Sequence, residues 1–223
     1  MSKQEIPAII QIEAENDRQA ELLKQRLHAR GIWTVNVMGA PGAGKTSVIR
    51  GLIGALAPEK AYVLEGDIES DLDTRQLQAA GVTTVQINTH GACHLDAPVV
   101  AATLADYPFA ESGVLFIENI GNLVCPAEFN IGEDIKLLVT TVTDGSDKPY
   151  KYPLAFEKAS LIVVNKADLL PYVDFDWAFF LVGVRALNPT APVIRLTSRP
   201  GPASPDDGFA EIVRWIRQQR QMN

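Results

Sequence analysis

The stretch GAPGAGKT, residues 39–46, fits the pattern G-x-x-x-x-G-K-S/T of a phosphate-binding loop. The apolar residues before it predict a buried strand and the residues after it predict a helix, which is the context that the motif requires. Glycines let backbone N–H groups close around phosphate oxygens, and the helix N-terminus adds positive potential. The stretch therefore predicts a P-loop nucleotide site. The residues expected to contact the nucleotide are Gly39, Gly42, Ala43, Gly44, Lys45, Thr46 and Ser47.

Seven apolar runs rich in Val, Ile and Leu extend this interpretation along the chain. They alternate with polar and helical stretches, a pattern typical of parallel strands that are covered on both faces. We therefore expect an α/β fold, a three-layer P-loop NTPase with a mostly parallel sheet and helices on both faces. Ligands bind at the carboxyl ends of the strands in such sheets. The runs cover residues 32–39, 61–67, 82–88, 114–119, 135–142, 161–168 and 192–198.

The chain divides into a short leader and one large domain. Ala20, Leu23 and Leu27 recur at helical spacing and predict a helix over residues 13–30, with Gly31 as its stop. We expect residues 1–31 to form a helical leader without a site, in which His28 is simply solvated. Residues 32–223 are expected to form one P-loop domain, in which the candidate nucleotide and metal residues are embedded.

Composition narrows the possible partners and location. The net charge is −7 and no basic stripe occurs, so we expect no nucleic-acid partner. No run of 18 apolar residues and no signal-peptide pattern is found, so we expect no membrane association and a cytoplasmic protein. In that compartment a structural disulfide is not expected, and the two cysteines are either buried small hydrophobes or thiolate ligands.

The sequence NKAD, residues 165–168, follows another apolar run and predicts a loop that reads guanine. The Asp168 carboxylate can accept hydrogen bonds from both the ring N–H and the exocyclic amine of guanine, a donor pair that adenine lacks. Together with the phosphate loop, this favours GTP over ATP. The residues expected to contact the guanine nucleotide are Asn165, Lys166 and Asp168, and Ser198 and Arg199 from the next strand end could pack on the base.

Two acidic residues at predicted strand ends are candidates for the magnesium region. Mg²⁺ prefers oxygen ligands and keeps several waters, so Asp67 and Glu118 could ligate it beside Thr46 or position the attacking water. Either acid could instead be a helix N-cap or a solvated loop residue. We expect catalysis to depend on Lys45, Asp67 and Glu118, with Lys45 reaching the β- and γ-phosphates.

The third candidate site is a group of cysteine and histidine residues. Cys93 and His94 follow the run over residues 82–88, and Cys125 follows the run over 114–119, so the three side chains can converge if those strands are neighbours. Thiolate and imidazole ligands suit Zn²⁺ and Ni²⁺, but three ligands do not complete a tetrahedron. The fourth position could be taken by water, by His90, or by a second chain across a two-fold axis.

Several motifs, in their order along the chain, resemble one known family. These motifs are GAPGAGKT, EGD, CHLDA, ENIGNLVCPAEFNIGE, DKPYKYP and NKADL. They resemble the HypB-type hydrogenase nickel-incorporation GTPases of the SIMIBI class, which are related to urease accessory GTPases. The resemblance runs from Trp33 to Trp215. Urease accessory relatives carry a Cys-Pro-His metal motif, so the adjacent Cys93 and His94 favour the hydrogenase branch.

The resemblance implies a GTP-dependent metallochaperone that serves maturation of nickel–iron hydrogenases. It implies a slow GTPase with bound GTP or GDP and Mg²⁺, nickel or zinc held by Cys93, His94 and Cys125, and a GTP-dependent homodimer. Other maturation factors and the hydrogenase large subunit are the implied partners. The chain has no Cys-rich N-terminal nickel motif and no His-rich tract, and His90 is not a typical family feature. A small-molecule kinase and a nucleotide-regulated metal scaffold are the alternatives.

Overall fold

The computed structural model describes residues 5–66, 78, 82–87, 91–198 and 207–222. Within them, a seven-stranded sheet has the order β3-β2-β4-β1-β5-β6-β7, and every neighbouring pair is parallel. The predicted α/β class and parallel sheet are therefore confirmed. The strands are β1 (Ile32–Gly39), β2 (Ala61–Glu65), β3 (Thr83–Gln86), β4 (Gly113–Glu118), β5 (Ile135–Thr141), β6 (Leu161–Asn165) and β7 (Val193–Arg195).

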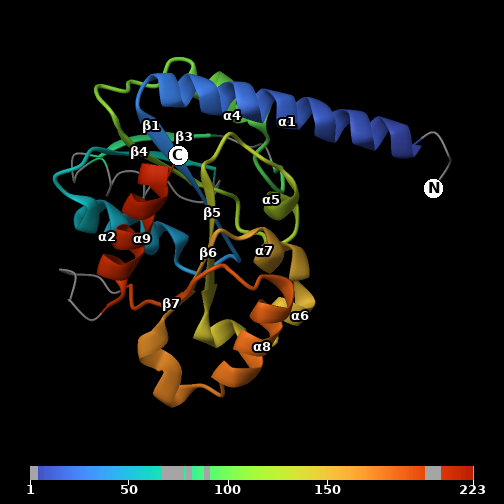
Figure 1. Ribbon diagram of the computed structural model, residues 1–223, viewed down its shortest axis with the longest axis vertical. Helices are drawn as coiled ribbons and strands as arrows, with labels where there is room; N and C mark the ends of the chain where they lie inside the picture. Colours follow the sequence, from blue (N-terminus) through green and yellow to red (C-terminus); the bar gives the residue numbers. More distant parts are fainter. Residues whose placement is uncertain (1–4, 67–77, 79–81, 88–90, 199–206, 223) are drawn as a thin grey trace.

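Helices cover both faces of this sheet (Figure 1). Helices α2 and α9 pack on one face, α1 and α4 cover one half of the other face, and α7 and α8 cover its second half. This is the predicted three-layer arrangement. The helical elements are α1 (Glu5–Ala29), α2 (Lys45–Leu56), α4 (Ala97–Leu104), α5 (Cys125–Glu128), α6 (Lys148–Lys151), α7 (Pro153–Lys158), α8 (Trp177–Leu187) and α9 (Phe209–Met222), with the 3-10 turns η1 (Val142–Asp144) and η2 (Ala167–Tyr172).

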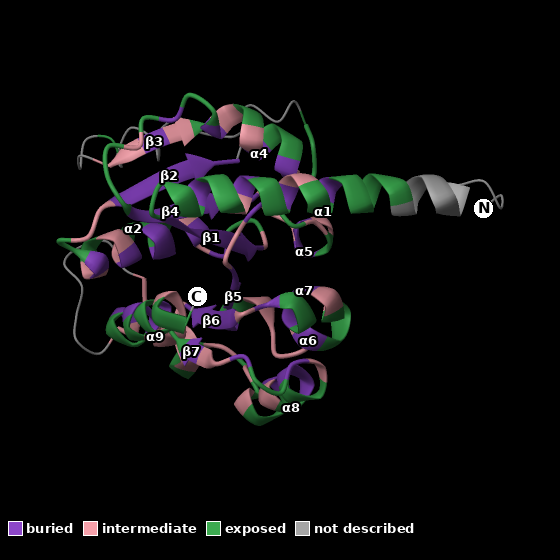
Figure 2. Cartoon of the chain, turned by 45° about the horizontal axis from the view of Figure 1, so that its top comes forward, coloured by how far each residue is buried: buried purple, intermediate pink, exposed green. Residues whose placement is uncertain are grey.

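The alternation of side chains along the strands explains why helices are needed on both faces. In β1, Val35 and Val37 point toward α2 and α9, while Met38 packs on the other side. In β5, Leu137 and Leu138 divide between the two faces in the same way. Successive residues of a strand point to opposite faces, so a strand that is apolar throughout requires cover on both. Figure 2 shows the central strands buried and the helices exposing their outer sides.

Most strands end slightly earlier than the apolar runs predicted, by up to three residues. For example, β6 ends at Asn165 and β7 at Arg195, whereas the runs continued to residues 168 and 198. Polar side chains there turn out of the ladder and hydrogen-bond across to other loops, as Asn165 does. The early strand ends therefore form the loops in which most of the candidate site residues lie.

Helix α1 is longer than predicted and is docked on the sheet. It begins at Glu5 rather than at residue 13, and its first turns extend beyond the rest of the fold (Figure 1). The periodicity of buried residues marks only the docked part, where Ala20, Leu23 and Leu27 are each at most 4% exposed. Pairs such as Glu15 with Arg18, 2.7 Å apart, support the exposed part. Among the described residues, no helix is long and apolar enough to cross a membrane.

The expectation that His28 is merely solvated is wrong. Its Nε2 lies 2.7 Å from Oδ1 of Asp134, whose side chain is fully buried and which also accepts a hydrogen bond from the Thr34 backbone N–H. Lys24 approaches the same carboxylate at 3.2 Å. The last turns of α1 are therefore attached to the start of β1 and β5 by a shared buried acid, a contact that the isolated helix sequence does not reveal.

Candidate nucleotide and metal site

The phosphate loop lies at the carboxyl end of β1, as predicted. The strand ends at Gly39, where a Cβ would lie 2.5 Å from the Val139 carbonyl oxygen, so only glycine fits between the two strands. Gly44 has φ +87°, a left-handed conformation that side chains rarely adopt, and it precedes the first residue of α2. That first residue is Lys45, which is only 5% exposed. The loop is thus closed between the sheet and a helix N-terminus.

Thr46 and Glu118 meet beside this loop. Strands β1 and β4 are neighbours, with Val37 opposite Glu118, and this register brings the end of β4 next to the start of α2. The Thr46 hydroxyl donates a 2.9 Å hydrogen bond to Oε1 of Glu118, which is 4% exposed. A hydroxyl and a buried carboxylate in contact are oxygen ligands of the type that Mg²⁺ prefers. The second predicted acid, Asp67, lies outside the described residues.

The predicted guanine loop is braced against the phosphate loop. Asn165, 1% exposed, donates through Nδ2 to the Ala43 carbonyl at 3.0 Å, and the Lys166 ammonium donates to the Gly42 carbonyl at 2.9 Å. These two residues fix the relative position of the two loops, and Asp168 in η2 remains partly exposed at the same end of the sheet. Asn165 and Lys166 therefore act on the phosphate loop in this structure.

Ser198 has a different contact from the one predicted for it. We expected it to pack on the base with Arg199, but its N–H and its hydroxyl both donate to Oδ1 of Asn165, at 3.2 and 2.9 Å. Ser198 therefore orients the amide that holds the phosphate loop. Arg199 lies outside the described residues.

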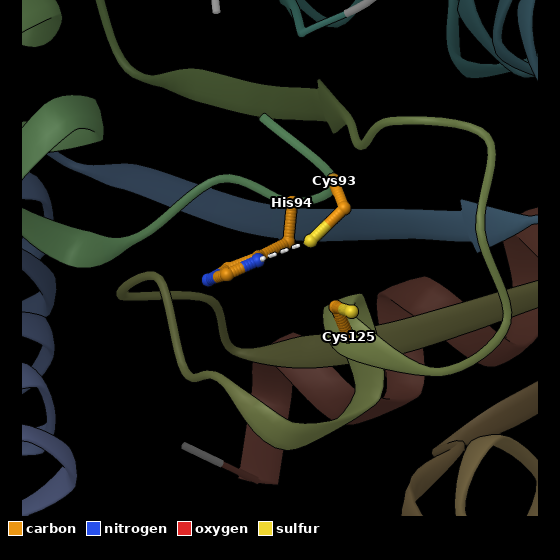
Figure 3. A group of neighbouring side chains, drawn as sticks. All are labelled: Cys93, His94 and Cys125. Atoms are coloured by element: carbon orange, nitrogen blue, oxygen red, sulfur yellow. Dashed lines mark hydrogen bonds between the residues drawn. The ribbon is translucent and has the colours of Figure 1, made fainter. Parts of the chain in front are cut away.

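Cys93, His94 and Cys125 converge at one place, although not by the predicted route. Strands β3 and β4 are not neighbours, because β2 lies between them. The loop after β3 and the segment after β4 nevertheless bring the three side chains together, with their ligand atoms all within 4.8 Å of one another. Figure 3 shows Cys93 and His94 on adjacent positions of one loop and Cys125 facing them from the start of α5. His90 lies outside the described residues.

The donor set fits a single transition-metal ion. Ligands at about 2.0–2.3 Å from a tetrahedral ion lie about 3.3–3.8 Å apart. The distance from Cys93 Sγ to His94 Nδ1 is 3.3 Å, already within that range, and the third ligand needs a shift of about 1 Å at most to satisfy the same geometry. Two thiols and an imidazole suit Ni²⁺ and Zn²⁺ rather than Mg²⁺ or Ca²⁺.

The side chains around this cluster influence its protons and its shape. The pKa of the Cys125 thiol is raised above its ordinary value, first by its hydrogen bond with Cys93 and then by burial. The Cys125 thiol thus keeps its proton more readily, and a bound metal ion would displace that proton. The His94 ring stacks on Phe129, with ring centroids 4.1 Å apart and planes 15° from parallel. Phe129 was not predicted as a site residue, because an aromatic residue beside a cysteine has no metal-ligand chemistry of its own.

Asn122 connects the metal cluster to the phosphate loop. Its backbone forms an antiparallel bridge with Gly39 at the end of β1. Its side chain donates to the Cys93 carbonyl at 3.3 Å and accepts from the Val124 N–H at 2.9 Å, directly before Cys125. One residue therefore contacts the nucleotide loop and both metal-bearing segments, and it was missed because an asparagine in a loop has no pattern of its own.

Buried polar side chains also hydrogen-bond to the backbones of the two segments that carry the metal ligands. Oδ1 of Asn119 accepts from the N–H of Leu95, the residue after His94, at 3.3 Å, and from the Ile120 N–H at 2.9 Å. The Lys136 ammonium donates to the carbonyls of Ala127 and Phe129 at 3.1 and 3.2 Å. Both segments thus have fixed backbone attachments close to the ligands.

Together, the parallel sheet, the phosphate loop with its buried lysine and the adjoining Cys/His cluster define a P-loop nucleotide-binding protein with a metal-binding surface. Residues 33–195 match the family described as CobW/HypB/UreG, nucleotide-binding domain, and the chain belongs to this family, in its HypB branch. The predicted resemblance is therefore confirmed.

Among its relatives, the hydrogenase maturation factor HypB of Azotobacter vinelandii is 44% identical over 92% of this chain and 67% of its own length. HypB of Escherichia coli strain K12 is 39% identical over 92% of this chain and 70% of its own length. The chain thus spans roughly two thirds of these relatives.

Solved structures agree with the sequence relatives. The crystal structure of HypB from Archaeoglobus fulgidus superposes with a TM-score of 0.83 at 34% identity, covering 92% of this chain and 98% of that one. HypB from Helicobacter pylori in complex with nickel gives a TM-score of 0.85 at 31% identity, covering 93% and 96%. The signal recognition particle receptor FtsY from Elizabethkingia anophelis, at 17% identity and a TM-score of 0.54, shares the fold alone, over 89% of this chain and 71% of that one.

Proposed function

We propose that this protein is a GTP-hydrolysing metallochaperone that binds nickel, or zinc, and assists nickel insertion during maturation of nickel–iron hydrogenases. The observation that carries the proposal is the short segment that connects the phosphate loop with the metal cluster. Thr46 contacts Glu118 at the phosphate loop, and four residues later Asn122 contacts the backbone of Cys93. The relatives named as hydrogenase maturation factors, and the HypB structure in complex with nickel, support the choice of cargo.

Nucleotide hydrolysis is assigned to the carboxyl ends of β1, β4 and β6. In the proposed reaction Lys45 and the N–H groups at the start of α2 stabilise charge on the transferring phosphoryl group. Mg²⁺, held beside Thr46 by Glu118 or Asp67, would neutralise charge on the phosphate oxygens when bound. One of these two acids positions the attacking water. Asp168 selects guanine through its two acceptor oxygens.

The metal cargo is assigned to Cys93, His94 and Cys125. All three lie where solvent or another protein reaches them, since Cys93 is exposed and the other two are half-buried. An open site suits a carrier, because the fourth ligand position can accept water during storage and a recipient's ligand during transfer. The same open position could be filled by a second chain, which is the basis for proposing a GTP-dependent homodimer.

We infer that nucleotide state changes the metal site through residues 118–125. These residues run from the acid at the phosphate loop to the third metal ligand. Nucleotide-dependent loops of this kind have two arrangements, ordered by the terminal phosphate and released on hydrolysis. A shift at Glu118 is transmitted by the Asn122 contacts to both ligand segments, so hydrolysis alters the spacing of the ligands. Partners are other maturation factors and the hydrogenase large subunit.

The test is a spectroscopic titration of the full chain with Ni²⁺ and Zn²⁺, in the presence of GDP or of a non-hydrolysable GTP analogue. The same titration on Cys93→Ala identifies the site, and a size measurement in each sample reports dimerisation. We expect the nickel affinity to differ between nucleotides and to fall sharply in Cys93→Ala. Nickel binding that ignores both the substitution and the nucleotide would exclude the proposed function.

Phosphate release measured in parallel separates this function from its alternatives. Release of inorganic phosphate into water is expected. Transfer of the phosphoryl group to a metabolite would indicate a small-molecule kinase. Stoichiometric nucleotide binding without any phosphate release would indicate a scaffold that uses GTP only as a conformational ligand.

A further inference from the structure

A residue of helix α1 lies between the two segments that carry the metal ligands. Asn16 is 6% exposed, although it belongs to the part of the chain predicted to be a leader without a site. Its Oδ1 accepts a 2.9 Å hydrogen bond from the N–H of Ala97, and its Nδ2 donates a 2.9 Å hydrogen bond to the carbonyl of Asn130. One planar amide therefore joins two backbones that are distant in sequence.

Both attachment points are close to metal ligands. Ala97 is three residues after His94, and Asn130 directly follows Phe129, the ring on which His94 stacks at 4.1 Å. A change in the distance between Ala97 and Asn130 therefore displaces the imidazole relative to its stacking partner. Metal affinity is sensitive to such shifts, because outer contacts that orient a histidine ligand typically change it by about 10- to 100-fold.

Asn16 is not what holds α1 on the protein. Apolar packing of Ala20, Leu23 and Leu27, and the contact of His28 with buried Asp134, attach the helix independently. Burying an amide in this interface lowers stability unless both of its polar groups are satisfied, whereas an apolar side chain would need no such partners. These other contacts of α1 do not involve Asn16, and its amide adds one hydrogen bond to each ligand segment.

We propose that Asn16 is a positioning residue for the metal site, through which α1 sets the spacing between the Cys93–His94 loop and the Cys125–Phe129 segment. The proposal rests on the proposed function, since it presumes that these ligands bind the metal. Asn16 contacts neither the metal ligands nor the phosphate loop. Its effect is exerted on the backbones at Ala97 and Asn130.

Two substitutions of Asn16 test the proposal in the full chain. Asn16→Ala removes both hydrogen bonds. Asn16→Asp keeps the acceptor for Ala97 but places a carboxylate oxygen against the Asn130 carbonyl, so it keeps the attachment to one segment only. The probe is Ni²⁺ alone, followed by the thiolate-to-nickel charge-transfer absorbance. We expect both variants to weaken nickel binding by about tenfold and to change that spectrum. GDP affinity is expected to match the wild type.

Two control variants separate positioning from loss of stability. Leu23→Ala loosens the packing of α1 and is expected to lower the melting temperature while leaving the nickel spectrum unchanged. Asp17→Ala removes a contact from α1 to the Asn130 side chain, 2.8 Å long, that involves only one segment, and it is expected to change nickel affinity by less than about twofold. If Leu23→Ala reproduces the spectral change, Asn16 has only a stabilising role and the proposal is wrong.

Cys93→Ala distinguishes failure of this proposal from failure of the proposed function. If Cys93→Ala loses nickel binding while both Asn16 variants retain the affinity and spectrum of the wild type, the site stands and the role of Asn16 is overturned. If Cys93→Ala binds nickel as the wild type does, the proposed function falls and this inference falls with it. Asn16→Asp carries the test alone should Asn16→Ala fail to fold.

Discussion

The phosphate loop and the metal cluster lie at the same end of the sheet, but they are held in different ways. The phosphate loop is braced by buried side chains, with Lys45 5% exposed and Asn165 1% exposed. The metal cluster lies at the surface, and Cys93 is exposed. Its ligands come from two segments that follow strands separated by β2. One site is therefore built into the core, and the other is assembled on top of it.

The difference indicates which site moves when the two are coupled. Close packing resists small displacements, whereas surface segments held by a few hydrogen bonds open and shift at low cost. In the proposed coupling, the phosphate loop would therefore serve as a fixed reference to which the metal segments adjust. The proposed metallochaperone function would use this division, because it requires the nucleotide to be held firmly while the cargo site changes its affinity.

Lys45→Ala is the strongest test of whether the phosphate loop is held independently of the metal cluster. Loss of a buried cation at the developing phosphoryl charge is expected to lower the GTP hydrolysis rate by about 100- to 1000-fold. Because the metal segments are attached elsewhere, nickel affinity of the nucleotide-free protein is expected to stay within about twofold of the wild type. Hydrolysis is measured by phosphate release and nickel affinity by titration. A large loss of nickel affinity without nucleotide would contradict the separation of the two sites.

Asp168→Asn tests base recognition, which belongs to the nucleotide site. The amide keeps one acceptor oxygen for the ring N–H but replaces the other with an N–H donor, which opposes the exocyclic amine of guanine and suits xanthine, which carries a carbonyl in place of that amine. GDP affinity is expected to fall by about 100-fold and xanthosine diphosphate affinity to rise. Both affinities are measurable by calorimetry. Unchanged GDP binding would show that η2 does not read the base.

The sequence predicted where the phosphate loop lies in the sheet, whereas it predicted the arrangement around the Cys/His cluster only in part. A phosphate loop is contiguous, so GAPGAGKT with its flanking strand and helix specified both its residues and its place in the sheet. NKAD also placed its loop correctly. The motif did not reveal that Asn165 forms hydrogen bonds with Ala43 and Ser198, because these contacts join residues up to 122 positions apart.

The metal cluster shows where sequence reasoning stops. Cys93, His94 and Cys125 were identified from residue type. Their convergence was expected if the preceding strands were neighbours, and that condition is not met, since strand order is a property of the whole sheet. The supporting residues Phe129, Asn122 and Asn16 carry no metal chemistry and follow no periodic pattern. Their roles depend on distances between segments far apart in the chain, which a sequence without a structure does not provide.

Phe129→Ala tests whether the stacked ring orients His94 in the metal cluster. Removing the ring that stacks on His94 frees the imidazole to rotate, and we expect nickel affinity to fall by about five- to tenfold, from a stacking contribution of about 1 kcal/mol. Phe129→Leu is the matched control, because it keeps an apolar side chain but no stacking face. It is expected to lose part of the affinity. If both variants bind nickel like the wild type, the stack does not orient the ligand.

Asn122→Ala addresses the link between the two sites and is expected to have the smallest effect. The backbone bridge to Gly39 remains, so nucleotide affinity should be unchanged, while the side-chain bonds to Cys93 and Val124 are lost. Since a hydrogen bond contributes about 0.5–1.5 kcal/mol, the difference in nickel affinity between the GDP form and the GTP-analogue form is expected to shrink by about two- to threefold.

Asn122→Asp is the informative control for this link, since it keeps the acceptor for the Val124 N–H and loses the amide donor that contacts the Cys93 carbonyl. If the coupling runs through the Cys93 loop, both variants lose it equally. If Asn122→Asp couples normally while Asn122→Ala does not, the path runs through Val124 to Cys125 instead. An undiminished nucleotide effect in both variants would place the coupling outside Asn122 and leave the backbone of residues 118–125 as the element that moves.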